Sequence, residues 1–383
     1  MKIQLQPKVL KWVRERARLG TAELAKKIGI QEERVKQWEQ TGELSEASAR
    51  RLAQRTYAPY GYLFLQKPLD ERLPISDFRR VSQAGGGRAT PDLLDVLYQA
   101  KRRQNWYRDY LVGNLEEPLP FVGKATLQTS PITVAKDIRN TIGLGPKLTA
   151  SCQDWEDAMR CQIEATEDAR ILVLRSSVVE GNTRRPLSVD EFRGFALSDK
   201  YAPLIFINGA DARSAQMFTL AHEVAHIWLG ESGISNLERT YPAGNAIEKF
   251  CNSVAAEVLL PLEIIRSEWR HNAILENEMS RLSHKYKISR IVVARRARDA
   301  QFIAEQTYVK FYEREMAFSS ARKSGGGDYY LNEQLLNSRR FSAAIVQDAY
   351  EGRTLYQDAM NLLSIKKEET FRKFAESLQI TPA

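Results

Sequence analysis

Two histidines one helical turn apart, with a glutamate directly after the first, are the residues best suited to chemistry. They lie in the segment His222-Glu223-Val224-Ala225-His226. Residues i and i+4 share one face of a helix, so both imidazoles can bind the same ion. A Zn²⁺ held by two imidazoles and a carboxylate keeps a fourth position for water and lowers the pKa of that water toward ~7. Glu223 is then placed to take the proton, and the resulting hydroxide can attack a peptide carbonyl. The segment therefore predicts a zinc-peptidase site.

The rarity of histidine makes this pattern specific. The chain has four histidines, at positions 222, 226, 271 and 284. A chance HExxH is expected in well under about one in a hundred chains of this composition. The alternative interpretation is a helix whose histidines are satisfied inside the core.

A third ligand is needed, because two histidines leave the ion too open to be held tightly. The downstream candidates are Glu248, Glu257 and Glu238. Glu248 and Asn252 are four residues apart and share a helix face, so Asn252 could support a ligand from behind. Glu257 is two and a half turns further on and falls on the opposite side of the helix. We favour Glu248; the alternative is an ordinary exposed carboxylate near a helix start.

The elements that must position these residues alternate between strands and helices. We expect strands at 171–174, 195–197 and 204–207, and helices at 214–229 and 246–260, the second stopped by Pro261. In zinc peptidases of this helical type an edge strand commonly pairs with an extended substrate. The strand 204–207, just before the zinc helix, is the candidate for this role, and a plain structural strand is an equal alternative.

The rest of the chain reads as mostly helical, which predicts an α+β fold. Apolar residues recur at helical spacing in residues 6–65, and a second amphipathic helix is expected at 92–111. Triple glycines at 85–87 and 325–327 mark two hinges. The predicted domains are an N-terminal helical unit (1–66), a linker and helical connector (67–129), a zinc-peptidase domain (130–310) and a helical C-terminal region (320–383).

Composition sets the class and the compartment. The chain has 383 residues, 43% of them hydrophobic, which is enough for two or three cores. No signal peptide and no membrane span are evident, so we expect a cytoplasmic protein with no membrane partner. Its three cysteines (Cys152, Cys161 and Cys251) include no C-x-x-C pair, so neither a disulfide framework nor a thiolate zinc site is suggested.

Charge is concentrated at one end of the chain. The net charge is +8, and residues 1–65 hold 13 Lys and Arg against 7 Asp and Glu. Such an asymmetry is the expected footprint of a nucleic-acid contact. A basic solvated surface is the alternative.

The string QMFTLAHEVAHIWLG, followed by IEKFCNSVAAEVLLP, resembles the ImmA/IrrE family of bacterial metallopeptidases over residues 165–300. Members of that family cleave a DNA-bound repressor or a related regulatory protein. The resemblance implies Zn²⁺ as the cofactor, His222, His226 and Glu248 as its ligands, and Glu223 as the catalytic acid and base. It also implies a zincin-like domain in which a small sheet supports the HExxH helix.

Many proteins of this family begin with a helix-turn-helix of the Xre/Cro type, and residues 6–65 resemble one. Residues 21–28 would form the first helix, with Thr21 as its N-cap and Gly29 at the turn, and residues 32–40 the recognition helix. Val35 and Trp38 would anchor that helix, and Arg34, Lys36 and Gln37 would face DNA. Glu32 and Glu33 depart from this pattern, because they repel phosphate. Docking of a partner protein is the alternative.

Two functions follow from the resemblance. The first is a zinc endopeptidase that cuts a repressor or antitoxin-like regulator and carries its own DNA-binding domain. The alternative is a DNA-binding regulator or antitoxin whose peptidase domain senses a signal or binds a toxin without turnover. In the C-terminal tail, Ala359, Leu362, Leu363 and Ile365 would form the core of a second small helix-turn-helix, with Lys366 and Lys367 exposed.

Overall fold

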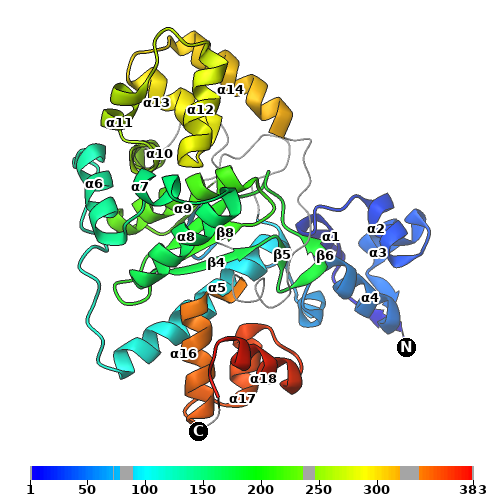
Figure 1. The fold of residues 1–383 in the computed structure, drawn as a ribbon. Helices are drawn as coiled ribbons and strands as arrows, with labels where there is room; N and C mark the ends of the chain where they lie inside the picture. Colours follow the sequence, from blue (N-terminus) through cyan, green and yellow to red (C-terminus); the bar gives the residue numbers. More distant parts are fainter. Residues whose placement is uncertain (1, 72, 78–88, 236–245, 320–335, 382–383) are drawn as a thin grey trace. The chain divides into compact units, whose positions relative to one another are not determined.

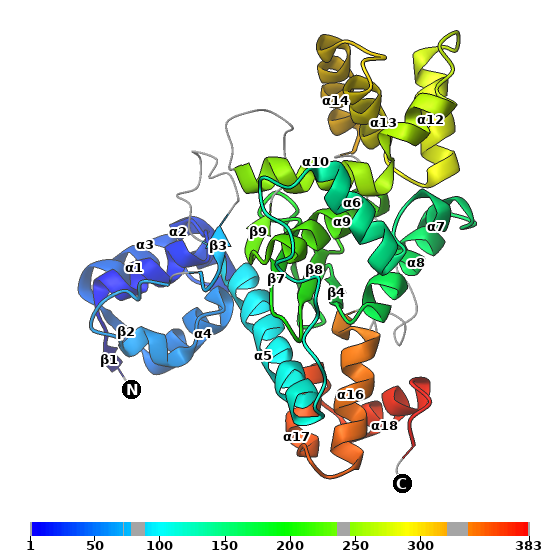
Figure 2. The same ribbon diagram turned by 90° about the vertical axis from the view of Figure 1, so that its left-hand side faces the viewer.

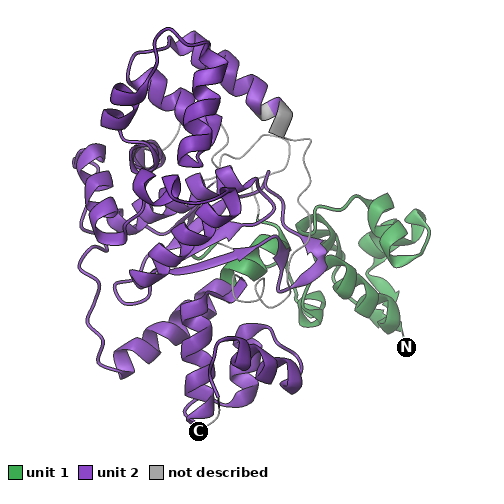
Figure 3. Ribbon diagram, viewed as in Figure 1, with its two compact units in different colours: residues 1–74, 81–98 green, residues 75–80, 99–383 purple. Residues whose placement is uncertain are grey.

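The computed structural model describes residues 2–71, 73–77, 89–235, 246–319 and 336–381. The chain divides into two compact units (Figure 3). Unit 1 comprises residues 1–74 and 81–98, and unit 2 comprises residues 75–80 and 99–383. The triple glycines at 85–87 and 325–327 and the candidate ligand Glu238 lie outside the described residues.

Unit 1 is a bundle of short helices closed by a small antiparallel ribbon. Its elements are β1 (Lys2–Gln4), α1 (Pro7–Arg16), α2 (Thr21–Ile28), α3 (Glu32–Thr41), β2 (Glu43–Ser45), α4 (Glu46–Thr56) and the 3-10 helix η1 (Tyr60–Phe64). The core gathers apolar residues from all four α-helices, among them Val9, Leu24, Val35, Trp38 and Leu52. Arg14 on α1 donates two hydrogen bonds to the Glu39 carboxylate on α3, at 2.6 and 3.0 Å. This half-buried bidentate pair fixes α3 against α1.

The helices expected at 21–28 and 32–40 are present, but one capping assignment was wrong. Gly20, not Thr21, is the N-cap of α2, and its amide donates to the Glu23 carboxylate at 2.8 Å. Thr21 is the first helical residue, and its hydroxyl donates to Glu32 Oε1 at 2.6 Å. Thr21 therefore links α2 to α3 instead of starting α2. Gly29 ends α2 with a φ of 78°, as the turn requires.

The central part of unit 2 is built on a five-stranded mixed sheet. Its strands are β3 (Ser76–Asp77), β4 (Leu172–Ser176), β7 (Gly194–Leu197), β8 (Leu204–Asn208) and β9 (Gly233–Ser235), in the order β3-β9-β7-β8-β4. β4 pairs with β8 in parallel, β7 is antiparallel to both β8 and β9, and β3 pairs with β9 in parallel. A separate ribbon joins β5 (Val178–Val179) to β6 (Asn182–Pro186). All three predicted strands are confirmed.

Of the two alternatives for residues 204–207, the plain structural strand is present, and the substrate-pairing edge strand is excluded. β8 is paired on both sides, with β4 from Leu172 to Ser176 and with β7 from Gly194 to Leu197. Its backbone groups are therefore committed to the sheet and cannot recruit a substrate strand. Every residue of β8 is buried, which fits an interior strand.

Five helices cover the sheet or pack on those that do (Figure 1). They are α6 (Pro131–Ile142), α7 (Pro146–Ala150), α8 (Trp155–Asp168), α9 (Arg213–Leu229) and α10 (Ala246–Leu259). α9 packs against β7 and β8, and α10 packs against α9 and α6. The predicted helices at 214–229 and 246–260 are thus confirmed. The α9 helix ends at Gly230, which has a φ of 73°.

A further group of helices extends the same core. It comprises α11 (Leu262–Glu268), α12 (Leu275–Tyr286), α13 (Arg290–Asp299) and α14 (Glu305–Ser319). Met279, Leu282, Val293 and Tyr308 from these helices belong to the cluster that contains the buried face of α9. The mostly helical α+β class predicted from the sequence is confirmed.

The C-terminal helices pack on α5 (Pro91–Gly113), as both ribbon views show (Figure 2). These helices are α16 (Arg339–Tyr350), α17 (Tyr356–Leu363) and α18 (Glu368–Ser377). Arg103 on α5 is buried and donates to the carbonyl oxygens of Leu362 at 2.8 Å and Leu336 at 3.3 Å. Gln99 donates to the Ser364 hydroxyl at 2.6 Å. Main-chain acceptors in the tail are thus satisfied by α5.

The predicted core of the tail is largely confirmed. Ala359, Leu363 and Ile365 are buried, and Leu362 is half-buried. Lys366 and Lys367 are exposed, as expected. Among the described residues, no helix has the length and apolarity that crossing a membrane requires.

Glu167, near the end of α8, meets the start of α16. Burial raises the pKa of Glu167 to about 7, although hydrogen bonds from Ser338, Val173 and the Arg340 backbone oppose the shift. The Arg340 guanidinium also donates to the Glu167 carbonyl at 2.9 Å. A carboxyl group with this raised pKa contributes stability below its ordinary pKa near 4.5 and loses it as the pH rises toward 7.

Replacing Glu167 by glutamine should therefore increase the free energy of unfolding more at high pH than at low pH. Between pH 4.5 and 7.5 the unfolding free energy of the variant should rise relative to wild type by at most about 3 kcal/mol. Urea denaturation at several pH values measures this difference. The matched change Glu164→Gln, at an exposed carboxylate on the same helix, should show no such trend. A pH-independent difference for Glu167→Gln would contradict the prediction.

Candidate metal centre

The helix that carries the HExxH segment is almost entirely buried. The α9 sequence RSAQMFTLAHEVAHIWL contains neither glycine nor proline, so nothing interrupts its hydrogen bonding. His222, Glu223 and His226 are each 0% exposed. At its C-terminal end, Trp228 stacks on Phe121 with ring centroids 4.5 Å apart, and its indole N–H donates to Asp137 at 2.8 Å. The two histidines therefore lie on a helix that is held rigidly.

Three side chains from two helices converge at one point. The Nε2 atoms of His222 and His226 lie 3.1 Å apart. The Glu248 carboxylate, from α10, lies 3.1 Å from His226 Nε2 and 3.4 Å from His222 Nε2. One ligand atom from each residue falls within 4.8 Å of the others. This is the spacing of a candidate metal site with two imidazoles and one carboxylate.

Asn252 orients the first histidine. Its side-chain Oδ1 lies 3.1 Å from His222 Nδ1. An amide oxygen can only accept, so Nδ1 carries the hydrogen and Nε2 keeps its lone pair directed at His226 and Glu248. Asn252 thus contacts one of the two candidate histidine ligands, and this contact selects the tautomer whose Nε2 can bind a metal.

The electrostatics of the three residues fit a cation. Burial acts to raise the pKa of Glu248, but the neighbouring His222 and His226 outweigh it and hold that pKa well below its usual range. Burial acts to lower the pKa of His222, yet the Glu248 carboxylate and the Asn252 contact leave it raised. Burial lowers the pKa of His226. Two imidazole nitrogens and a carboxylate converge at one buried point, where a positive ion would bind all three.

Glu223 is buried beside this centre as a carboxyl group with no strong partner. Neither of its oxygens has a hydrogen-bond partner of normal geometry among the described residues. Burial raises the pKa of Glu223 to about 8; His222 and the Ser235 hydroxyl oppose this weakly, and the Glu248 charge adds to it. A carboxyl group of this kind accepts and releases a proton near neutral pH.

Comparisons with known families agree with this geometry. Residues 166–298 match the family model described as the IrrE N-terminal-like domain. The chain carries an IrrE-like metallopeptidase domain. Residues 337–377 match a family described as a domain of unknown function. No curated protein matches the chain significantly, and neither does any solved structure.

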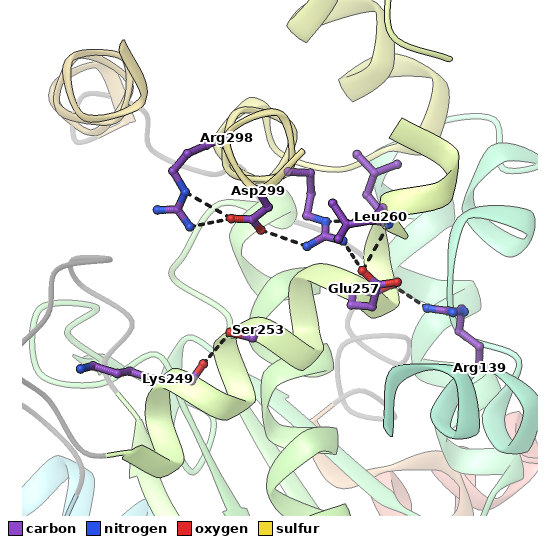
Figure 4. Close-up of polar contacts among 9 residues, drawn as sticks. Arg139, Lys249, Ser253, Glu257, Leu260, Arg298 and Asp299 are labelled. Atoms are coloured by element: carbon purple, nitrogen blue, oxygen red, sulfur yellow. Dashed lines mark hydrogen bonds and ion pairs between the residues drawn. The ribbon is translucent and has the colours of Figure 1, made fainter. Parts of the chain in front are cut away.

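Within the IrrE-like domain, Glu257 is not part of the group formed by His222, His226 and Glu248, and it makes polar contacts of its own (Figure 4). Its carboxylate pairs with the Arg296 guanidinium on α13 and accepts from the Leu262 amide at 3.2 Å. Arg139 donates to the Glu257 carbonyl at 2.6 Å. The opposite-face placement expected from the helical spacing is therefore present, and Glu257 serves packing.

Sequence reasoning missed two residues beside the centre. Ser235, at the end of β9, is fully buried, and its hydroxyl lies 3.5 Å from Glu248 Oε1. Nothing in its local sequence marks it. Gly194 on β7 lies directly under α9: a Cβ there would meet Thr219 Cγ2 at 2.6 Å and Glu223 Oε1 at 3.1 Å. An isolated glycine at the start of a strand signals such a close approach and could have been read from the sequence.

The predicted DNA-contacting residues lie in unit 1 on α3. Arg34, Lys36 and Gln37 are exposed, whereas Val35 and Trp38 are buried. Lys36 pairs with Glu32 at 2.9 Å, and Arg34 contacts Gln37 at 3.4 Å. The helix therefore presents both positive and negative groups on its exposed side. The two family matches reported above lie outside this unit.

Proposed function

We propose that this protein is a zinc-dependent endopeptidase that cleaves a transcriptional repressor or an antitoxin-like regulator. The observation that carries the proposal is the convergence of His222, His226 and Glu248 within 4.8 Å, with Glu223 buried beside them, in an IrrE-like domain. Two imidazoles and one carboxylate are a donor set that suits Zn²⁺ and leaves a position for water.

The chain's own residues divide the chemical work. Zinc would supply a Lewis acid that polarises the peptide carbonyl and makes a nearby water more acidic. Glu223 takes the proton from the attacking water and gives it to the nitrogen of the leaving amine, which balances the hydrolysis. Asn252 holds the His222 ring in the binding tautomer. Burial of Glu223 keeps bulk water from competing for its proton.

The cleavage assay uses the purified full chain with any transcriptional regulator that a neighbouring gene encodes, and with a proteome-derived peptide library. Mass spectrometry should identify cuts that 1,10-phenanthroline abolishes and added Zn²⁺ restores, while Mg²⁺ does not restore them. One zinc at the His222 site should be present per chain. Zinc-loaded protein that cuts neither the regulator nor any peptide would sink the proposal.

We also propose that unit 1 binds DNA through α3, which would bring the peptidase to a regulator on its operator. The exposed Arg34, Lys36 and Gln37 support this assignment. Replacing Arg34 and Lys36 by alanine should weaken binding to the protein's own promoter about tenfold or more and flatten its salt dependence. Fluorescence anisotropy at several salt concentrations measures both. Unchanged affinity in the double variant would contradict the assignment.

A further inference from the structure

The fold brings together two cysteines that lie nine residues apart in the sequence. Cys152 follows α7 and is buried, and Cys161 lies half-buried on α8. Asp157 is one helical turn before Cys161 on the same face of α8. The two Sγ atoms and one Asp157 carboxylate oxygen all lie within 4.8 Å of one another. A pair spaced C-x8-C matches no short metal motif, so the sequence alone gave no sign of it.

Local hydrogen bonds fix this cluster before any ion arrives. Asp154 caps α8 by accepting from the amides of Glu156 and Asp157. The Gln153 amide donates to Asp157 Oδ2 at 3.0 Å, which folds the loop back over the first turn. Cys161 Sγ contacts Asp157 Oδ1 at 3.9 Å, and Cys152 Sγ contacts the Leu148 carbonyl at 3.3 Å. Arg160 also pairs with Asp157 Oδ1 at 2.5 Å, but its side chain is 59% exposed and also pairs with Glu164 at 3.2 Å, so Arg160 keeps a partner when an ion takes the Asp157 oxygen.

We propose that Cys152, Asp157 and Cys161 form a second metal site that binds Zn²⁺ or a similar thiophilic cation. Two thiolates and one carboxylate are a zinc-type donor set, whereas Mg²⁺ and Ca²⁺ require oxygen ligands. Zn–S bonds of ~2.3 Å place two thiolates about 3.8 Å apart in a tetrahedral site. Small side-chain movements bring the observed cluster to that spacing, and water completes the coordination. Half-buried Cys161 gives an ion access from solvent.

A disulfide between the two cysteines is the competing use of the pair. The Asp157 carboxylate oxygen lies within 4.8 Å of both Sγ atoms. A disulfide makes no use of this oxygen, whereas a divalent cation binds it together with the two sulfurs. The arrangement of the three side chains therefore favours a metal over a disulfide.

The position of the site suggests a supporting role for the bound ion. Met159 and Ile163 of α8 pack in the same core cluster as Leu220 of α9. Glu156, also on α8, pairs with Arg213 at the start of α9. An ion bound by Cys152, Asp157 and Cys161 would link the loop before α8 to α8 itself. It would thereby stabilise α8, the helix that packs against α9. None of its ligands is shared with the His222 site.

Metal analysis and Co²⁺ substitution of the full chain, purified under reducing conditions, test this proposal. Wild type should hold two zinc ions per chain, and both Cys152→Ser/Cys161→Ser and His222→Ala/His226→Ala should hold one. Co²⁺-loaded wild type should show thiolate charge-transfer absorption in the near ultraviolet. That absorption should persist in the histidine variant and in the matched control Cys251→Ala, and disappear from the Cys152/Cys161 double variant.

A measurement on wild type alone tests the proposal even if the Cys152→Ser/Cys161→Ser variant does not fold. Zn²⁺ should slow alkylation of Cys161 by iodoacetamide at least tenfold, as followed by mass spectrometry of the peptide. One zinc per chain with no thiolate absorption would overturn the proposal. So would a Cys152–Cys161 disulfide that forms on air exposure in the presence of Zn²⁺. Loss of peptidase activity alone affects neither result, so failure of the proposed function is separately visible.

Discussion

Glu223→Gln is expected to abolish peptide hydrolysis while leaving the metal in place. The amide has the size of the carboxyl group but cannot take a proton, so kcat/KM should fall about 10²–10⁴-fold. The carboxyl group is buried and has no strong partner of its own, so its loss should cost little stability. Initial cleavage rates, zinc content and thermal unfolding of the purified variant measure the three quantities.

The control for Glu223→Gln is a glutamate that lies outside the candidate metal centre. Glu263 on α11 is exposed, so Glu263→Gln makes the same chemical change where no proton is transferred. It should retain wild-type activity and zinc. If Glu223→Gln kept more than a tenth of wild-type activity, the proton would be moved by another group. If it lost zinc, Glu223 would belong among the ligands.

Removing one partner of the buried Glu257–Arg296 pair should lower the free energy of unfolding more than any other substitution proposed here. Both side chains are 5% exposed. Arg296 also donates to the Leu260 carbonyl at 2.7 Å and to Asp299 at 3.0 Å. Arg296→Met leaves the Glu257 carboxylate buried without its countercharge, which should lower the unfolding free energy by about 3–5 kcal/mol. Urea denaturation followed by tryptophan fluorescence measures it.

Two further variants separate charge from packing. Glu257→Leu/Arg296→Met removes both charges and should recover most of the stability lost by Arg296→Met alone. Arg298→Met removes a more exposed arginine of the same helix, paired with Asp299 at 2.7 Å, and should cost less than about 1 kcal/mol. A loss for Arg298→Met as large as that for Arg296→Met would show that burial does not set the cost.

Features with a local cause were predictable from the sequence. The α9 helix follows from an unbroken apolar run, and the His222–His226 spacing places both rings on one face whatever surrounds them. Glu248 and Asn252 could be paired for the same reason. Pro261 and Gly29 mark ends of helices through their backbone preferences alone.

Features set by distant pairing were not predictable. The strand 204–207 is interior because β4 and β7 pair with it from both sides. A short apolar run in the sequence does not indicate which strands will pair with it. Threonine is a common N-cap residue, but the Thr21 hydroxyl donates its hydrogen bond to Glu32 on the next helix instead. Cys152 and Cys161 meet only because the chain turns back between α7 and α8.

The contacts made by strand β3, by α5 and by the segment after α5 limit where the chain can be shortened from its N-terminal side. β3 covers the outer edge of β9, the strand that ends at Ser235 beside the metal centre. Gln104 donates to the carbonyls of Leu197 and Ala202, and the amides of Gly123 and Ala125 donate to the last turn of α9. A fragment that starts at residue 130 would lose all of these contacts and bare an unpaired strand edge. A fragment that keeps these contacts and the full pairing of β9 therefore has to begin before residue 76.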